Sequence, residues 1–438
     1  MSLLRLRSAA SRYGCIYAAS YLPLWLYCSK EGLWQRRHLL PELVLRGKPD
    51  AGMTIRNYMR MAMRLAFPTS VLPLSAIVSF CILSGASAVS ALSYSMVDIG
   101  DLPGGADATY ARGLNELGQV VGYGATATGY HAFLWDSGVL TDLGVVAGGS
   151  ESYALGINDA GQIVGYSTRD GVNHAILWES GAISDLGNLP GGTVGSYATA
   201  INNAGQIVGF SSADDSSRGF VWSDGVMTDI GAAYGGTDDT FALGISDDGS
   251  AIVGYFNDGT VNSAALWKDG EMIEIGNLPG GHGSAFAYGV NDSGAVVGYT
   301  SSSTGPRAFL WEDGVLTNLG DLPGGLNYSQ AMAINASGQI VGRSGSEAGV
   351  HAFVWKNGKM VDLNGEIDAL LGVSLVNAYD VNDKGQILAI GKTASGANHA
   401  FLLTPLAVPV PAGLPLLSSG FLMLAVSRRR LRRRLRRG

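Results

Sequence analysis

Residues 153–187 read YALGINDAGQIVGYSTRDGVNHAILWESGAISDLG, and versions of this stretch recur from residue 96 to residue 403. The register is marked by a Trp that ends an apolar run, at Trp135, Trp178, Trp222, Trp267, Trp311 and Trp355, with Leu403 in the seventh place. Successive Trp residues are 43, 44, 45, 44 and 44 positions apart. A period of about 40–45 residues with four short strands per unit is typical of propeller blades, whereas helical repeats need long 3.6-residue periodicity. The sequence therefore predicts an all-β propeller.

Each repeat divides into four apolar segments, which we call strands a to d. They are rich in Ile, Val, Phe and Thr, and Asn, Asp and Gly separate them. Turns such as 158–161 and 224–225 fit tight a–b and c–d hairpins on one side of a blade. The more variable b–c loops, and d–a crossings built on Leu-Pro-Gly-Gly, then share the other side. We expect recognition on that side, because variable loops on a rigid scaffold usually carry it.

Strand a has the strictest pattern. Two residues after an Ala found in every repeat, six of the seven repeats have Gly or Ala, and Asp380 is the exception. Residues two apart share a strand face, so one face of strand a is almost bare. Crowding near a central axis explains this pattern. The Ala residues are Ala111, Ala154, Ala198, Ala242, Ala287, Ala331 and Ala378.

The two ends of the repeat region complement each other. Residues 96–100 form a strand d with no blade before it, whereas no strand d follows residues 399–403. We therefore predict a seven-bladed propeller over residues 92–404, closed by strand 96–100, because closure removes both exposed sheet edges. An open β-solenoid is the alternative, although it would need capping repeats that we do not find.

The segment 53–91 has the pattern of a secretory signal peptide. Arg56, Arg60 and Arg64 precede an apolar stretch at 65–83. Small residues at the expected cleavage region follow, namely Ala86, Ala88 and Ala91. An uncleaved signal anchor is the alternative. We interpret residues 1–52 as a misassigned upstream extension.

The C-terminal segment has three parts. A linker at 405–411 leads into an apolar segment at 412–427, predicted to span a membrane, and an Arg-rich cytoplasmic tail at 428–438. The tail resembles the PEP-CTERM class of sorting signals, with Val410 where Leu is commoner. This resemblance implies processing by an exosortase-type enzyme of a Gram-negative bacterium, after transient anchoring in the inner membrane. The sorting motif is Val408, Pro409, Val410 and Pro411.

The repeats resemble the HAF family of extracellular repeat proteins, named for the His-Ala-Phe seen at 131–133, 351–353 and 399–401. Neither resemblance supplies catalytic residues. Residues 92–410 hold 33 acidic and 10 basic side chains, a formal charge of −23, which argues against nucleic acid as a partner. Cys15, Cys28 and Cys81 precede the cleavage region, so the mature domain has no thiol chemistry.

The sequence predicts no metal site and no cofactor. A recurring His on strand c is replaced by Arg218, Ser263 and Arg307, and the His residues are too scattered for ligands that must converge on one ion. We interpret them as strand-edge hydrogen-bond donors, at His131, His174, His351 and His399. The Asn-Asp turns lack the ligand spacing of calcium loops, so turn formation explains them.

Two sets of residues are candidates for function. Acids and a His that break the repeat would serve a carbohydrate-active enzyme, at Asp214, Asp215, Asp238, Asp239, His282 and Asp380. Aromatic side chains in one slot of strand a are candidates for stacking on sugar rings, with packing between blades as the alternative, at Tyr110, Tyr153, Tyr197, Phe241 and Phe286.

Together these patterns predict an exported, surface-retained protein with a binding or matrix role, associated with extracellular polysaccharide or biofilm. We expect no catalytic residues and no enzymatic activity. The alternatives are an exported carbohydrate-active hydrolase or lyase, and a purely structural matrix unit.

Overall fold

The computed structural model describes residues 28–29, 32–33, 93–213, 216–231 and 239–406. The chain divides into two compact units, Met1–Ala86 and Ser87–Gly438. In the first unit the described residues form two short paired strands, β1 (Cys28–Ser29) and β2 (Gly32–Leu33). The signal-peptide, sorting and membrane-span predictions lie outside the described residues.

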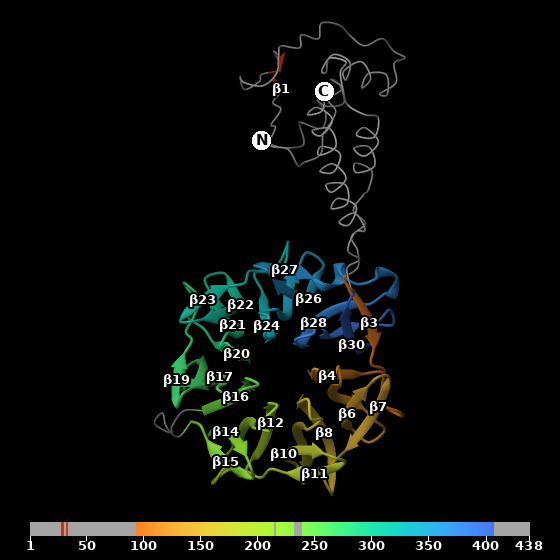
Figure 1. Cartoon of the computed structure of the whole chain (residues 1–438), viewed down its shortest axis with the longest axis vertical. Helices are drawn as coiled ribbons and strands as arrows, with labels where there is room; N and C mark the ends of the chain where they lie inside the picture. The colour runs from red at the N-terminus through yellow and green to blue at the C-terminus, as the bar shows by residue number, and fades with distance from the viewer. Residues whose placement is uncertain (1–27, 30–31, 34–92, 214–215, 232–238, 407–438) are drawn as a thin grey trace, which may run out of the picture. The chain divides into compact units, whose positions relative to one another are not determined.

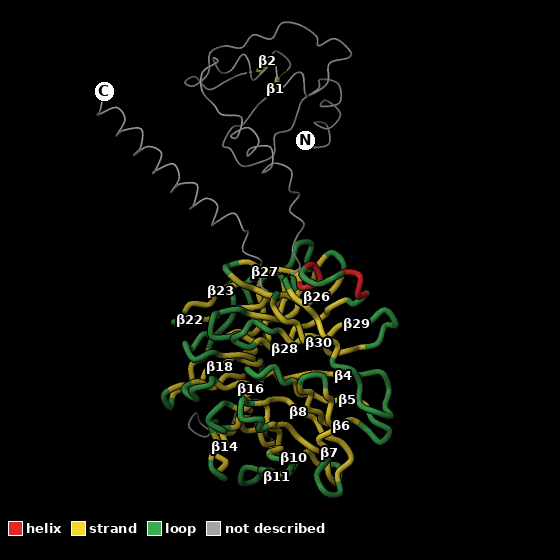
Figure 2. Tube along the Cα trace, turned by 45° about the vertical axis from the view of Figure 1, so that its right-hand side comes forward, coloured by secondary structure: helices red, strands yellow, loops and turns green. Residues whose placement is uncertain are grey.

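The second unit is a β-propeller whose sheets stand around a common axis (Figure 1). Five sheets have four antiparallel strands each, in the order a, b, c, d from the axis outward. The remaining eight strands form one sheet, in which two groups of four meet at a single parallel pair, Asn173 and Gly195. The all-β propeller prediction is confirmed, and Figure 2 shows strands joined by short loops.

The first three groups of strands are β4 (Thr109–Leu114), β5 (Val120–Ala125), β6 (Tyr130–Asp136) and β7 (Val139–Gly144); β8 (Gly149–Ile157), β9 (Ile163–Arg169), β10 (Val172–Glu179) and β11 (Ala182–Asp185); and β12 (Gly195–Ile201), β13 (Ile207–Ser212), β14 (Ser217–Ser223) and β15 (Val226–Asp229). Next come β16 (Asp239–Ile245), β17 (Ala251–Asn257), β18 (Asn262–Lys268) and β19 (Glu271–Glu274); β20 (Ala285–Val290), β21 (Val296–Ser302), β22 (Gly305–Glu312) and β23 (Val315–Asn318); and β24 (Ser329–Ile334), β25 (Ile340–Ser346), β26 (Gly349–Lys356) and β27 (Lys359–Asp362). Two 3-10 turns, η2 (Leu363–Gly365) and η3 (Ala369–Leu371), precede the last group, which is β28 (Ser374–Val381), β29 (Ile387–Lys392), β30 (Asn398–Pro405) and β3 (Tyr94–Asp98).

The ring closes through the N-terminal strand. β3 pairs antiparallel with β30, from Tyr94 opposite Pro405 to Asp98 opposite Phe401. In Figure 1 the orange β3 lies beside the blue β30. The predicted closing strand is confirmed, two residues earlier than the 96–100 expected. Because β4 of the first repeat also contacts β28, β29 and β30, the open solenoid alternative is wrong.

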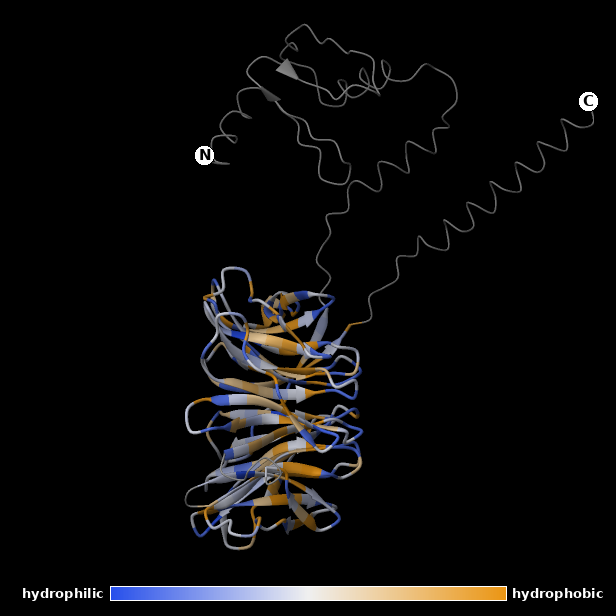
Figure 3. Ribbon diagram, turned by 90° about the vertical axis from the view of Figure 1, so that its left-hand side faces the viewer, coloured by the Kyte–Doolittle hydropathy of each residue, from blue (hydrophilic) through white to orange (hydrophobic). Residues whose placement is uncertain are grey.

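The hydrophobic core lies between neighbouring sheets rather than inside any one of them. One cluster joins Leu114 and Phe133 of the first repeat to Leu388 and Leu402 of the last. A buried Phe on strand c recurs at Phe133, Phe220, Phe309, Phe353 and Phe401, all at most 1% exposed. The edge-on view of Figure 3 shows hydrophobic colour concentrated along the strands. Each sheet therefore depends on its neighbours for burial.

The bare face of strand a is explained by close backbone approach. A Cβ added to Gly113 would lie 3.2 Å from Gly156 Cα in the next repeat, and one added to Gly289 would lie 3.1 Å from Ala333 Cα. The Ala of every strand a is fully buried. The prediction that small side chains reflect crowding near the axis is confirmed.

Candidate binding site

A cavity of about 560 Å³ opens at the axis, at the end of the ring that carries the a–b turns. Each strand a has a register shift between its Ala and the residue two positions later, so the residue between them has no partner across the strand. These bulges place one side chain from every strand a in the cavity wall. The residues are Arg112, Leu155, Thr199, Leu243, Tyr288, Met332 and Tyr379.

Arg112 is the only basic side chain among the residues that line this cavity. Its guanidinium carbon lies 4.3 Å from the centroid of the Tyr379 ring, across the seam between the first and last repeats. It also donates a 3.0 Å hydrogen bond to the Tyr123 hydroxyl. These contacts hold the guanidinium against the Tyr379 and Tyr123 rings.

Five carboxylates surround the mouth, one from each of five a–b turns: Glu116, Asp159, Asp247, Asp292 and Asp383. Most of them accept a hydrogen bond from the backbone of the preceding turn in the ring. The Glu116 amide donates to Asp159 over 2.8 Å, and the Asp383 amide donates to Glu116 over 2.6 Å across the seam between the last and first repeats. Four of the five acids are therefore linked to a neighbouring turn, and Asp247 is the exception.

Asp247 differs from the other rim acids. Among the described residues no group donates a hydrogen bond to its carboxylate. Its pKa is raised by desolvation, and then by the negative charges of Asp292, Asp159, Asp383 and Glu116. A carboxylate in this setting favours a positive charge beside it.

Below the rim, amide side chains tie successive repeats together. The Asn115 Nδ2 donates to the Asn158 carbonyl over 3.1 Å, and the same bond recurs in every other repeat except the one with Ser246, up to Asn382, which donates to Asn115 over 3.0 Å. The same Asn uses its Oδ1 to cap its own turn, as in the bond from the Gln162 amide to Asn158. The turn role predicted for Asn is confirmed, but its link to the next repeat was missed. An amide accepts with its oxygen and donates with its nitrogen at the same time, and the recurrence of Asn at this position was the available signal.

Asp380 takes the place of the small residue in the last strand a. Its carboxylate accepts hydrogen bonds from the Leu114 and Val381 amides, both over 2.8 Å, and so joins the last repeat to the first. Burial raises its pKa from the ordinary value of 3.8 to about 6, although these two bonds act in the opposite direction. The side chain lies in the cavity wall. Asp380 therefore links the last strand a to the first strand a at the point where the ring closes.

The raised pKa of Asp380 predicts a pH dependence of stability. Between about pH 4 and 6 the folded chain holds a proton that the unfolded chain has released, so the free energy of unfolding falls as the pH rises. The loss amounts to about 3 kcal/mol at about 1.4 kcal/mol per pH unit. The Asp380→Asn variant has no such titration, so its stability relative to the unmodified chain should rise from pH 4 to pH 7. Urea unfolding at several pH values measures this, and parallel curves would contradict it.

The five predicted aromatic candidates form part of a belt of rings. Each stacks on an aromatic residue of strand b in its own repeat, with centroids 4.5–5.2 Å apart. The strand b ring then makes an edge contact with the next repeat, as Tyr123 does with Tyr153 at 4.8 Å. None of the five candidates lines the cavity. Packing between repeats, the alternative interpretation, explains their positions, and sugar binding by them stays a prediction.

The His residues of strand c each contact an Asp of the neighbouring strand d. His131 Nδ1 lies 2.8 Å from Asp142, and the same pairing occurs for His174, His351 and His399 at 2.6–2.9 Å. Arg218 makes the same contact with Asp229 at 3.1 Å. The other Asp oxygen accepts from a backbone amide two residues on, as Asp142 does from Gly144. The hydrogen-bonding role predicted for His agrees with this geometry.

The remaining candidates do not gather in one place. Asp239 accepts a 2.6 Å bond from the Ser217 amide, and His282 is exposed on a d–a crossing. Asp214, Asp215 and Asp238 lie outside the described residues, as do the cleavage region and the sorting motif. No helix among the described residues is long and apolar enough to cross a membrane.

Comparison with known proteins finds solved structures that have a similar fold but a low sequence identity to this chain. No family model and no curated protein matches the chain. TolB from Acinetobacter baumannii is 12% identical with a TM-score of 0.36, over 66% of this chain and 80% of that one. Dipeptidyl peptidase 4 from Porphyromonas gingivalis is 10% identical with a TM-score of 0.34, over 80% and 64%. The PQQ-bound aldose sugar dehydrogenase from Streptomyces coelicolor is 11% identical with a TM-score of 0.34, over 72% and 99%.

These likenesses correct one prediction. We expected a protein without enzymatic activity, but the similar structures include a dipeptidyl peptidase and a sugar dehydrogenase, which are enzymes by name. The conclusion that the chain is not an enzyme was therefore wrong as drawn, because a propeller of this kind leaves enzymatic activity undecided. At these TM-scores the likenesses carry no argument about the site.

Proposed function

We propose that this chain is a binding protein whose axial cavity takes an oligosaccharide with free amino groups. Five carboxylates from five repeats at the mouth of one cavity support this proposal most strongly. A volume of about 560 Å³ lies within the range of ligand pockets, roughly 300–1,000 Å³. Protonated amines on the sugar would meet the rim carboxylates, while hydroxyl groups would meet the polar groups of the wall.

The number of blades and the location of the protein in the cell are proposed from the sequence patterns. We count each half of the eight-stranded sheet as one blade, which makes a ring of seven. The signal pattern at 53–91 and the sorting motif at 408–411 support export, anchoring in the inner membrane and processing by an exosortase-type enzyme. A strongly acidic domain outside the cell would associate with a cationic polysaccharide of the matrix by electrostatic attraction.

The test compares two sugars that share a backbone and differ in whether the 2-amino group is a free, protonated amine or a neutral acetamide. Binding of glucosamine oligomers and of their N-acetylated counterparts to the full chain is measured by calorimetry in low salt. We expect the free-amine oligomers to bind at least tenfold more tightly. Raising the salt should weaken that binding, because screening acts on charge pairs exposed to solvent. The Asp247→Asn and Asp292→Asn changes, made together, should weaken it about tenfold.

A matched control is Asp269→Asn, because Asp269 lies in an exposed c–d turn and does not line the cavity. It changes the net charge but should leave affinity within twofold. Equal affinity for both sugars, or an equal loss in the control, would refute the proposal. Binding of basic peptides without binding of the amino sugars would also refute it.

A further inference from the structure

Ring closure assembles three potential metal ligands from opposite ends of the described propeller. His399 lies on β30, and Asp101 and Asp107 lie on the crossing that follows β3. Their ligand atoms all lie within 4.8 Å of one another. His399 Nε2 is 2.5 Å from an Asp107 oxygen and 3.4 Å from an Asp101 oxygen. One imidazole nitrogen and two carboxylates are a common donor set for divalent metals.

Neighbouring groups fix the orientation of two of these ligands. His399 Nδ1 lies 2.8 Å from Asp98, so Nε2 is the nitrogen that faces Asp101 and Asp107. The buried Thr109 hydroxyl lies 2.5 Å from the other Asp101 oxygen. A carboxylate behind a His ligand is a recurring support of protein metal sites, since it sets the tautomer and the ring position.

The charge of the cluster favours a cation. Three Asp side chains surround one imidazole, and the ion pairs of His399 are all with Asp. The cluster thus attracts positive charge, and a metal ion would supply it in place of a proton.

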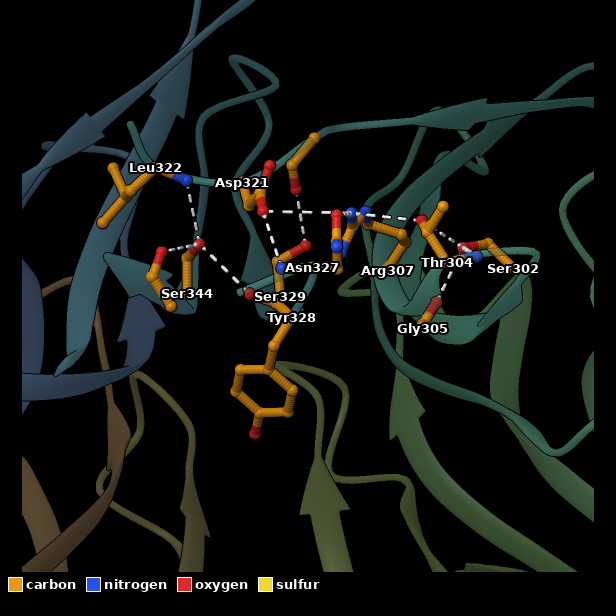
Figure 4. Close-up of polar contacts among 12 residues, drawn as sticks. Ser302, Thr304, Gly305, Arg307, Asp321, Leu322, Asn327, Tyr328, Ser329 and Ser344 are labelled. Atoms are coloured by element: carbon orange, nitrogen blue, oxygen red, sulfur yellow. Dashed lines mark hydrogen bonds and ion pairs between the residues drawn. The ribbon is translucent and has the colours of Figure 1, made fainter. Parts of the chain in front are cut away.

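In another repeat, the position that corresponds to His399 holds a permanently charged side chain, Arg307. Asp101 and Asp321 each precede a Leu-Pro-Gly-Gly crossing, and Asn327 takes the place of Asp107. There Arg307 takes the place of His399, and its Nη2 contacts the Asn327 amide oxygen and lies 3.8 Å from Asp321 (Figure 4). Arg307 is only 6% exposed. The Arg307 repeat contains none of the seam residues, and it too has a positively charged group between its d–a crossing and its strand c.

We propose that Asp101, Asp107 and His399 bind one divalent transition metal ion, with zinc as the type case, and that the ion clamps the seam of the ring. The shorter imidazole leaves the space that a guanidinium fills in the Arg307 repeat, and Asp replaces Asn at the crossing. Because the ligands come from positions about 300 residues apart, binding would stabilise the closed ring over any opened form. Three protein ligands leave further coordination positions for water.

Cobalt is the probe, because its visible spectrum reports the ligand atoms. The full chain, stripped with chelator, is titrated with Co²⁺ and followed by absorption and by thermal unfolding. We expect one bound ion with nitrogen and oxygen ligands, displaced by Zn²⁺, and a rise in the unfolding temperature. Asp107→Asn, at a 57% exposed side chain, should keep the fold and weaken binding at least 100-fold. Asp98→Asn should weaken it about 10–100-fold, since Asp98 acts only through His399.

The matched control is His351→Gln. His351 makes the same contact with an Asp of strand d but lies outside the three-ligand cluster, so its loss should leave Co²⁺ affinity unchanged. The proposal is wrong if the full chain binds no Co²⁺, or if the Asp107→Asn variant binds Co²⁺ as tightly as the full chain does. It is also wrong if His351→Gln weakens binding as much as His399→Gln. A sulfur-to-cobalt band that persists in Asp107→Asn would assign the ion to cysteine instead, and a response to Ca²⁺ alone would exclude a transition metal.

Discussion

Deletion of residues 94–98 should abolish cooperative folding of the propeller. These residues form β3, which covers the outer edge of β30 and buries Tyr94 to 4% exposure. Truncating one buried aromatic side chain costs about 3–5 kcal/mol. Loss of the whole strand also removes a ladder of hydrogen bonds and exposes Leu402 and Leu403. The total approaches the full stability of a typical domain, about 5–15 kcal/mol.

Thermal unfolding followed by circular dichroism, together with size-exclusion chromatography, measures this effect. We expect a broad transition and aggregation through the freed strand edge. A synthetic peptide of residues 92–101 should restore a sharp transition when added in excess, because it can pair with β30 as the missing strand. A deletion variant that unfolds sharply at an unchanged temperature would show that closure by β3 does not hold the ring together.

Replacement of Gly298 by Ala should destabilise the ring by about 3 kcal/mol, the upper end of the usual cost of overpacking. A Cβ at this position would lie 1.9 Å from the Phe286 carbonyl oxygen and 3.0 Å from Ala287 Cα. Both are backbone atoms of strand a, so neither can move without disturbing the bulge that shapes the cavity. Strand b has Gly in this slot in six repeats, at Gly122, Gly165, Gly209, Gly254, Gly298 and Gly342.

The seventh repeat supplies the control. Ala389 occupies the same slot opposite Ala378, and β28 has a second register shift between Leu375 and Asn377 that the other repeats lack at this point. Ala389→Gly should therefore cost only about 0.5–1 kcal/mol, the usual penalty for Gly within a strand. Urea unfolding gives both values. If Gly298→Ala costs no more than Ala389→Gly, then contact with the strand a carbonyl does not explain the recurring Gly.

The two proposed sites are both attractive to positive charge, but they lie in different parts of the ring. The cavity mouth is built from a–b turns, and its carboxylates come from five repeats. The seam cluster is built from strand c and a d–a crossing, where we expected recognition. A variant at Asp107 should leave amino-sugar binding intact, and one at Asp247 should leave cobalt binding intact.

The repeat itself predicted the four strands, the tight turns, the small side chains of strand a and the closing strand. These features follow from local sequence, because a turn residue or an apolar alternation acts within a few positions of its place. The turn acids were also visible, but each turn taken alone lacked the ligand spacing of a calcium loop. That these acids together surround one cavity mouth could not be inferred from any single repeat.

The tertiary structure decided which of these residues meet. Carboxylates such as Glu116 and Asp383 come from different repeats and share one cavity mouth only because the sheets stand around an axis. His399 meets Asp101 and Asp107 only because β3 returns to β30. The geometry of closure, and not the order of residues, brings such distant groups within a few ångströms of each other.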